Sequence, residues 1–237
     1  TEPGVASRWG YRQRKVWGQE ATKQALIDIV CPPQGAQPPA LLFTASHGMG
    51  FPRGSVHQKP AQGAILCQDW PGFGNIQPGH YLTAADVPSE ARLHGSVIFH
   101  FACYGGGTPD YDHFFHQPNK AVPQIADAPF VSALPRKWLA HPGGGALACI
   151  GHVERAWGYS IIAPEASPQL LPFQNAIGMI LTGHPVGYAL KDFNERYAAL
   201  STGLATMLKK SQVSKTLDNE AYVTTWVQRN DAEGYIL

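Results

Sequence analysis

Four short apolar segments stand out along the first two thirds of the chain, each bounded by glycine, proline or histidine. They read ALLFTAS, GAILCQ, SVIFHFA and ALACIG, at residues 40–46, 63–68, 96–102 and 146–151. Apolar runs of this length between turn-forming residues are typical of strands with both faces covered. We therefore expect these segments to be strands, most of them buried.

Helical periodicity appears before the first of these strands and again after the last. Polar residues recur every four positions between Gln19 and Val30, at Glu20, Gln24 and Asp28, opposite an apolar stripe. The pattern predicts further helices at 124–140 (interrupted at Pro135), 168–182, 185 to about 210, and 218–231. Strands separated by helices or long irregular crossovers favour an α/β sandwich with a mostly parallel sheet.

Composition narrows the class of protein. The 237 residues show no repeat, low-complexity tract or clear linker, so we expect one domain over residues 1–237, and the missing initiator methionine suggests a piece of a longer polypeptide. A net charge of +1 disfavours a nucleic-acid partner. No apolar run of membrane-spanning length is present, so no membrane partner is expected. The cysteines are widely spaced, which favours a reducing compartment and a cytoplasmic location.

Two of the expected strands end in chemically reactive residues. The first runs into His47 and Gly48, and the third into Cys103 followed by a tyrosine and three glycines. Carboxyl ends of neighbouring parallel strands meet at one edge of a sheet, so the imidazole and the thiol can lie together. A thiol needs such a base to act as a nucleophile at neutral pH. Taken singly, each feature has an ordinary explanation, an inert buried cysteine and a histidine–glycine turn.

Four sequence blocks carry a family resemblance. They are FTASHGM, GAILCQDWPG, FACYGGGTP and ALACIGHVERAWGYS, with the histidine 56 positions before the cysteine. Together they resemble the caspase-like cysteine peptidases, and within them the bacterial gingipain-like and CHAT-domain group. The resemblance implies a caspase-like three-layer sandwich, with a mostly parallel central sheet flanked by helices. It also implies a hairpin at GAILCQDW.

The same resemblance assigns roles to residues. His47 would be the general base and acid, Cys103 the nucleophile and Gly48 part of the oxyanion hole. The N–H groups of Gly48 and Cys103 would be the oxyanion donors, with Gly48 leaving room for a substrate carbonyl. Neither a metal nor an organic cofactor is required. Phe101 stands where a polar or acidic residue shapes the substrate pocket of relatives, so their charge preference does not transfer.

Substrate contacts are expected in the loop after the fourth strand, GHVERAWGYS. Trp157 could wall the pocket for the P1 side chain, the one on the acyl side of the scissile bond. Glu154 would select a basic P1 side chain, or Arg155 an acidic one, by charge complementarity. The alternative is that Glu154 and Arg155 pair with each other at the surface.

Other polar clusters are weaker candidates. His113 and His116, with Asp110 and Asp112 nearby, lack the helical context that a metal site at this spacing needs, so no metal site is expected. The YGGGTP stretch lacks the glycine order of a phosphate-binding loop. The remaining histidines without a visible partner set are expected to be structural: His80, His94, His100, His141, His152 and His184.

The sequence thus predicts a cysteine endopeptidase, a thiol protease of the hydrolase class. It would cut peptide bonds of a protein or peptide substrate through a Cys103/His47 dyad and an acyl-enzyme intermediate. Regulatory domains or partner proteins are expected, because domains of this family often sit inside longer chains. The first alternative is a catalytically silent caspase-like module that binds partners. The second is an α/β nucleotide-binding domain, with a phosphate at YGGGTP.

Overall fold

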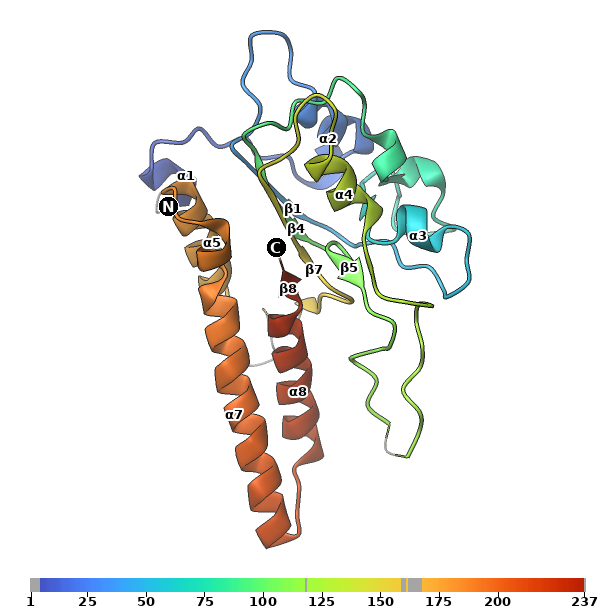
Figure 1. Cartoon of the computed structure of the whole chain (residues 1–237), viewed down its shortest axis with the longest axis vertical. Coiled ribbons are helices and arrows are strands. Elements are labelled where there is room, and N and C mark those ends of the chain that lie inside the picture. Colours follow the sequence, from blue (N-terminus) through green and yellow to red (C-terminus); the bar gives the residue numbers. More distant parts are fainter. Residues whose placement is uncertain (1–4, 118, 159–160, 162–167, 237) are drawn as a thin grey trace.

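A mostly parallel sheet forms the centre of the molecule (Figure 1). The computed structural model describes residues 5–117, 119–158, 161 and 168–236. In spatial order the strands are β1 (Leu41–Ala45), β4 (Val97–Phe101), β7 (Ala148–His152) and β8 (Tyr235–Ile236). The first three are parallel and β8 is antiparallel to β7. The prediction of a mixed α/β protein with a mostly parallel sheet is confirmed.

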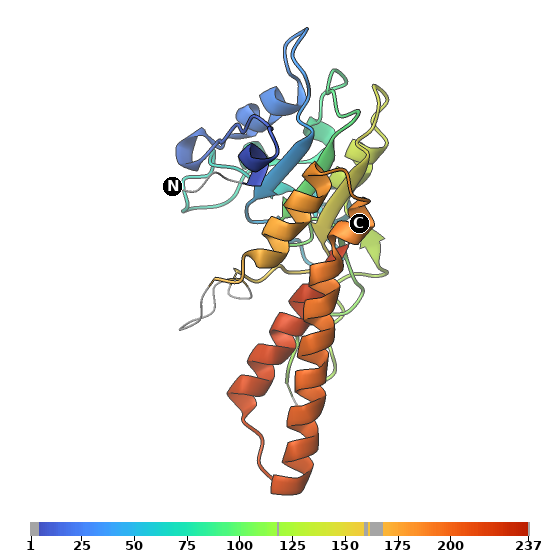
Figure 2. The same ribbon diagram turned by 90° about the vertical axis from the view of Figure 1, so that its left-hand side faces the viewer.

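Helices lie on both faces of this sheet (Figures 1 and 2). One face packs on α2 (Lys23–Val30) and α4 (Ala133–Leu139), with Ile98 of β4 in that core. The next residue, Phe99, faces the opposite core with α5 (Leu171–Leu181) and α7 (Lys191–Ser214). Because alternate residues of a strand point to opposite faces, a strand covered on both sides reads as a continuous apolar run.

The remaining elements are short or lie outside the main layers. The second predicted strand contributes only β2 (Ile65–Leu66), which pairs antiparallel with β3 (Tyr81–Leu82) in a separate small sheet rather than joining the central one. The others are α1 (Val5–Arg8), η1 (Gly18–Glu20), α3 (Gln58–Ala61), η2 (Pro78–His80), η3 (Ala84–Asp86), β5 (Gly107–Thr108), β6 (Phe130–Val131), α6 (Val186–Ala189) and α8 (Asn219–Glu233).

Two predicted helices differ from their observed extents. The segment expected at 124–140 is helical only from Ala133, and residues before it include β6. Pro135 stands in the first turn of α4, where its missing N–H costs no hydrogen bond, so it starts the helix rather than interrupting it. The segment expected from residue 185 divides into α6 and the longer α7, which continues to Ser214.

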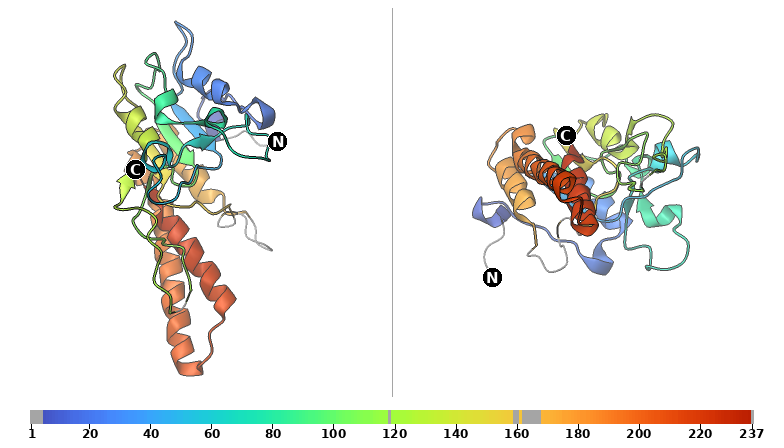
Figure 3. Two further views of the ribbon diagram at one scale, coloured as in Figure 1. Left: turned by 90° about the vertical axis from the view of Figure 1, so that its right-hand side faces the viewer. Right: turned by 90° about the horizontal axis from the view of Figure 1, so that it is seen from below.

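Helices α7 and α8 pack side by side as a long hairpin that extends beyond the sheet (Figures 1–3). The chain runs outward along α7 and returns along α8, which begins at its Asp218 cap. The end of α8 leads directly into β8 at the edge of the central sheet. The hairpin therefore brings the last turn of α8 to the carboxyl end of β7. Among the helices within the described ranges, none combines the length and apolarity needed to cross a bilayer.

His100 is a buried histidine of β4 with a structural role, as expected. Its Nδ1 lies 2.7 Å from the hydroxyl of Thr44, and its ring stacks on Trp138 at 4.4 Å. Burial lowers the pKa of His100 to about 3, from an ordinary value of 6.5. The folded chain therefore keeps this ring neutral where the unfolded chain would protonate it.

This difference predicts a pH dependence of stability. Between pH 6.5 and about 3 the unfolded chain binds the extra proton, so the free energy of unfolding falls as the pH is lowered through that window. The contribution approaches about 1.4 kcal/mol per pH unit. Urea unfolding at pH 7, 5.5 and 4.5 measures it. His100→Gln should show a shallower fall than the native chain, while exposed His94→Asn should not. Equal slopes for the native chain and His100→Gln would contradict the assignment.

Candidate active site

The two reactive strand ends lie side by side, as the topology argument predicted. Strands β1 and β4 are parallel neighbours in register, with Ala45 opposite Phe101. The chain beyond them stays together, because the amide of Ser46 donates to the carbonyl of Phe101 at 3.1 Å. The loops that begin at His47 and at Cys103 therefore leave the sheet at the same edge.

Gly48 is in close contact with the backbone of Cys103. A Cβ atom at position 48 would lie 1.8 Å from the Cys103 carbonyl oxygen and 2.9 Å from its nitrogen. The backbone of Gly48 also lowers the pKa of the Cys103 thiol, which favours its thiolate. The space on the Cβ side of Gly48 is therefore filled by the backbone of Cys103, and the role of the Gly48 N–H as an oxyanion donor stays a prediction.

The turn after Cys103 is held in an unusual conformation. Tyr104 has a φ of 57°, in the left-handed region that residues other than glycine rarely adopt. Its amide donates to the carbonyl of Glu154, and its carbonyl accepts from the hydroxyl of Ser132, each at 2.5 Å. Gly63 packs so closely that a Cβ there would lie 2.1 Å from the Tyr104 carbonyl oxygen. Such strained backbone at a reactive side chain is characteristic of functional sites.

The Cys103 thiol is partly buried. Its sulfur donates to the carbonyl of Ala156 at 3.6 Å. Burial raises the pKa of Cys103 above its ordinary value, while backbone hydrogen bonds at Ala156 and Gly48 and the charge of Arg155 oppose that rise. The carboxylate of Asp231 adds to the rise. Local groups that favour the thiolate are thus in place, but burial outweighs them.

Cys67 and Cys149 have less favourable surroundings for reaction than Cys103. Burial raises the pKa of Cys67 to about 11 and that of Cys149 to about 12. Burial also raises the pKa of Cys31, with Glu90 and Asp28 adding to it. Backbone groups of Ala156 and Gly48 favour the thiolate of Cys103, and a backbone group of Leu82 favours that of Cys67.

The imidazole of His47 is exposed at the edge of the site. The backbone carbonyl of His47 accepts a hydrogen bond from the amide of Leu66 at 3.0 Å, which fixes the main chain at this residue. Among the contacts within the described residues, none joins the ring to the Cys103 sulfur. The ring belongs to the residue before Gly48, which touches Cys103, so side-chain rotation decides how near it comes to the thiol. Catalytic hydrogen bonds often close only when substrate is bound.

Glu154 and Arg155 pair with each other, but not at the surface. Glu154 is 0% exposed, and its two carboxylate oxygens accept from the amide of His113 at 2.7 Å and from Arg155 at 3.1 Å. Arg155 also pairs with Asp112. Glu154 is thus buried and paired, which corrects the expectation that it meets a substrate side chain. The side chain of Arg155 is 33% exposed, so its contact with an acidic P1 side chain stays a prediction. Burial is the main cause that raises the pKa of Glu154.

Trp157 is a partly exposed aromatic residue that packs against Arg155 and Phe114. The guanidinium of Arg155 lies over its ring at 5.6 Å and over that of Phe114 at 5.5 Å. The two rings meet edge to face at 5.9 Å. Trp157 is next in sequence to Ala156, whose carbonyl accepts the thiol. The prediction that Trp157 contacts substrate remains open, and Phe114 joins it as a candidate.

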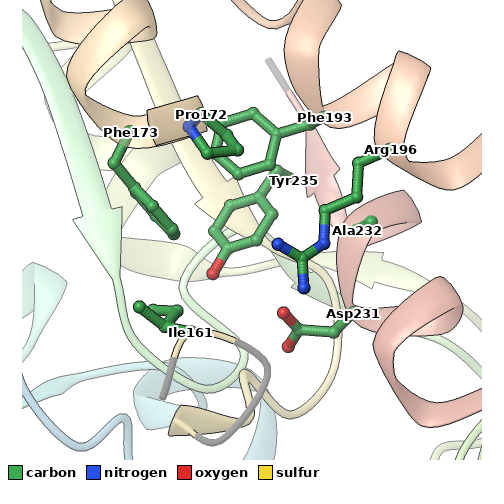
Figure 4. A pocket seen from close by; sticks show the side chains of 8 residues that line it. All are labelled: Ile161, Pro172, Phe173, Phe193, Arg196, Asp231, Ala232 and Tyr235. Carbon is green, nitrogen blue, oxygen red and sulfur yellow. The ribbon is translucent and has the colours of Figure 1, made fainter. Parts of the chain in front are cut away.

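A second group of residues near the site carries no sequence motif. Arg196 of α7, Asp231 of α8 and Tyr235 of β8 face one another across a narrow cavity walled by Phe173 and Phe193 (Figure 4). Tyr235 stacks on Phe101, two residues before Cys103, at 6.4 Å. Only the folding of the helical hairpin against the sheet brings this group to the site, so periodicity and spacing could not reveal it.

The weaker candidates of the sequence have other roles in the fold. The ring of His116 packs on Tyr222 and Trp226 at 5.6 and 5.2 Å. Within the described part of the chain, no group of three or more metal-ligating side chains is close enough to hold an ion. The glycines of YGGGTP are buried, and the amide of Gly106 donates to the carbonyl of His152 at 2.9 Å. Gly106, Gly107, Thr108 and Pro109 line an open hollow of about 330 Å³. The other lining residues are apolar and offer no charge to a phosphate: Pro129, Phe130, Val131, Val153 and Ile236.

The fold and site define an α/β protein with a thiol and an imidazole on adjacent ends of parallel strands. Comparisons of the chain with family models, curated proteins and solved structures found no match. What the site does is therefore inferred from its own residues.

Proposed function

We propose that this chain is a caspase-like cysteine endopeptidase with Cys103 as nucleophile and His47 as general base and acid. The observation that carries the proposal is the seating of Gly48 against Cys103, which joins the histidine loop to the cysteine turn at one sheet edge. Helices on both faces of the sheet support a caspase-like three-layer architecture. The strained Tyr104 turn supports a functional rather than a packing role for Cys103.

The chemistry follows from these groups. His47 takes the thiol proton, and the Cys103 thiolate attacks the scissile carbonyl carbon to form a C–S bond. His47 then delivers its proton to the amide nitrogen as the C–N bond breaks, leaving a thioester on Cys103. Water attacks the thioester with His47 again as base, releasing the acid product and restoring the thiol. The N–H groups of Gly48 and Cys103 are the proposed donors to the oxyanion.

Profiling with a peptide library tests the proposal. The native chain should cleave a subset of peptides, and the pattern of cleaved bonds reports the P1 preference. The same chain treated with iodoacetamide should cleave none of them once Cys103 carries the adduct, since the thiolate is the nucleophile. Cleavage that survives complete alkylation of Cys103 would refute the thiol mechanism.

A catalytically silent module of the same architecture is the second candidate. It is favoured by one observation: the Cys103 thiol donates to the carbonyl of Ala156, and no contact between it and an imidazole occurs among the described residues. Relative alkylation rates separate the two. The peptidase predicts that Cys103 reacts faster than Cys31, Cys67 and Cys149, whereas the silent module predicts no preference for Cys103.

A further inference from the structure

Asp231 is a buried carboxylate in the last turn of α8, close to the Cys103 site. It is 3% exposed, and its carboxylate faces the guanidinium of Arg196 and the hydroxyl of Tyr235 (Figure 4). The hairpin of α7 and α8 carries it to the carboxyl end of β7, where the loop of residues 153–158 begins. Burying a carboxylate costs free energy unless neighbouring groups donate hydrogen bonds or supply a positive charge. The groups in contact with Asp231 therefore indicate what the buried carboxylate does.

The first contact holds the loop that covers the thiol. The carboxylate of Asp231 accepts a hydrogen bond from the backbone amide of Trp157 at 2.8 Å. The preceding residue, Ala156, supplies the carbonyl that accepts the Cys103 thiol at 3.6 Å. One peptide unit therefore connects the α8 carboxylate to the atom in contact with the sulfur.

The second contact reaches the other side of the cysteine turn through His152. Nε2 of His152 lies 3.0 Å from the backbone oxygen of Asp231 and 3.4 Å from its carboxylate. Its Nδ1 lies 3.3 Å from the carbonyl of Glu154, the same oxygen that accepts from the amide of Tyr104. The ring is 0% exposed, and Gly234 packs against it so closely that a Cβ there would lie 2.3 Å away.

A neighbour of Asp231 holds a second loop at the site. The amide group of Asn230 donates to the carbonyl of His113 at 2.7 Å. His113 in turn donates its backbone amide to Glu154 at 2.7 Å. The end of α8 is thus hydrogen-bonded to the two segments around the Arg155 side chain. Asn230 contacts His113 in one segment, and Asp231 contacts Trp157 in the other.

We propose that Asp231 is the positioning residue of the Cys103 site, holding the 154–157 loop so that the Ala156 carbonyl keeps its place beside the thiol. This inference rests on the proposed peptidase function. Its effect on rate comes through orientation, because displacement of a catalytic environment by about 1 Å can cost about 100-fold in rate. Asp231 itself touches no reacting atom.

Two substitutions and a control on the same helix test this role. Asp231→Ala removes the acceptor of the Trp157 amide, whereas Asp231→Asn keeps an oxygen in its place. Glu233→Gln changes an exposed residue of α8 and serves as the matched control. The measurements are kcat and KM for the peptide that the native chain cleaves best, and the iodoacetamide reaction rate of Cys103 relative to Cys31 in the same molecule.

The expected result is a fall in kcat of about 100-fold for Asp231→Ala, with KM little changed. The Cys103-to-Cys31 alkylation ratio should change in the same variant. Asp231→Asn should recover most of both values, and Glu233→Gln should match the native chain. An unchanged kcat and alkylation ratio in Asp231→Ala would overturn the proposal. So would equal losses in the alanine and asparagine variants, since these would point to the charge rather than to the hydrogen bond.

Hydrogen exchange on the native chain tests the contact without any variant, should Asp231→Ala fail to fold. The amide of Trp157 should be protected well beyond an exposed loop amide, and exchange at the free-loop rate would overturn the proposal. These readouts also separate the two inferences. If the native chain cleaves no peptide, the peptidase proposal fails, while the alkylation ratio and the Trp157 amide still report whether Asp231 orders this loop.

Discussion

Replacing Cys103 with alanine is expected to abolish peptide cleavage, with a loss of at least about 10⁴-fold in kcat/KM. The physical reason is that the thioester route needs a nucleophilic sulfur, and neither Cys67 nor Cys149 has a comparable setting. Cys67 and Cys149 are buried in the core, where burial raises their pKa to about 11 and about 12. The measurement is the cleavage rate of the best library peptide by the variant and by the native chain.

The matched control is Cys31→Ala, which removes another partly buried thiol, near the end of α2. It should keep the native cleavage rate, and both variants should unfold at close to the native temperature. Mass spectrometry should locate the fastest iodoacetamide adduct of the native chain on Cys103. Cleavage retained by a folded Cys103→Ala variant would remove the basis of the proposed mechanism and leave the silent module as the better interpretation.

Replacing Gly48 with alanine is expected to damage both the site and the fold. The added methyl would lie 1.8 Å from the carbonyl oxygen of Cys103, which is backbone and cannot turn aside. Relief requires the ends of β1 and β4 to move apart, so overpacking should lower the free energy of unfolding by about 1–3 kcal/mol. The same movement carries His47 away from Cys103, so cleavage should fall with it.

Gly79→Ala is the control for this substitution, because a Cβ at that position meets no atom within 4 Å. It should leave the denaturation midpoint and the cleavage rate close to native. Urea unfolding and peptide cleavage measure the two effects on the same samples. If Gly48→Ala equals Gly79→Ala in both, the close contact between Gly48 and Cys103 does not exist in solution.

The three parallel strands of the central sheet could be predicted because the burial of a strand is reflected in its own short stretch of sequence. Strands β4 and β7 contribute to the cores on both faces, so each is a short run of apolar residues between turn formers. Strand β1 buries Leu42 on one face and leaves Phe43 41% exposed on the other. The segment around Ile65 has a similar composition, yet its partner is β3 and it lies outside the central sheet. Apolar composition reports burial, and it does not say which strand is the neighbour.

Strand β8 and the position of α8 could not be predicted in this way. Tyr235 and Ile236 form too short a strand to show a period, and they pair with β7 only because the hairpin returns the chain to that edge. The extents of α4 and α7 also differ from the predicted ones. Pro135 is compatible with the first turn of α4, and α7 continues to Ser214.

The sequence by itself determined which residues end the parallel strands, and so it placed His47, Gly48 and Cys103 at one edge of a sheet. That inference needs only local patterns and the general rule that parallel strands share their carboxyl edge. The tertiary structure alone decided what surrounds the thiol. It buries Glu154 in an ion pair, seats Gly48 against Cys103 and brings Asp231 to the loop beside it. These contacts join segments far apart in the chain, and their energies depend on how the helical layers pack.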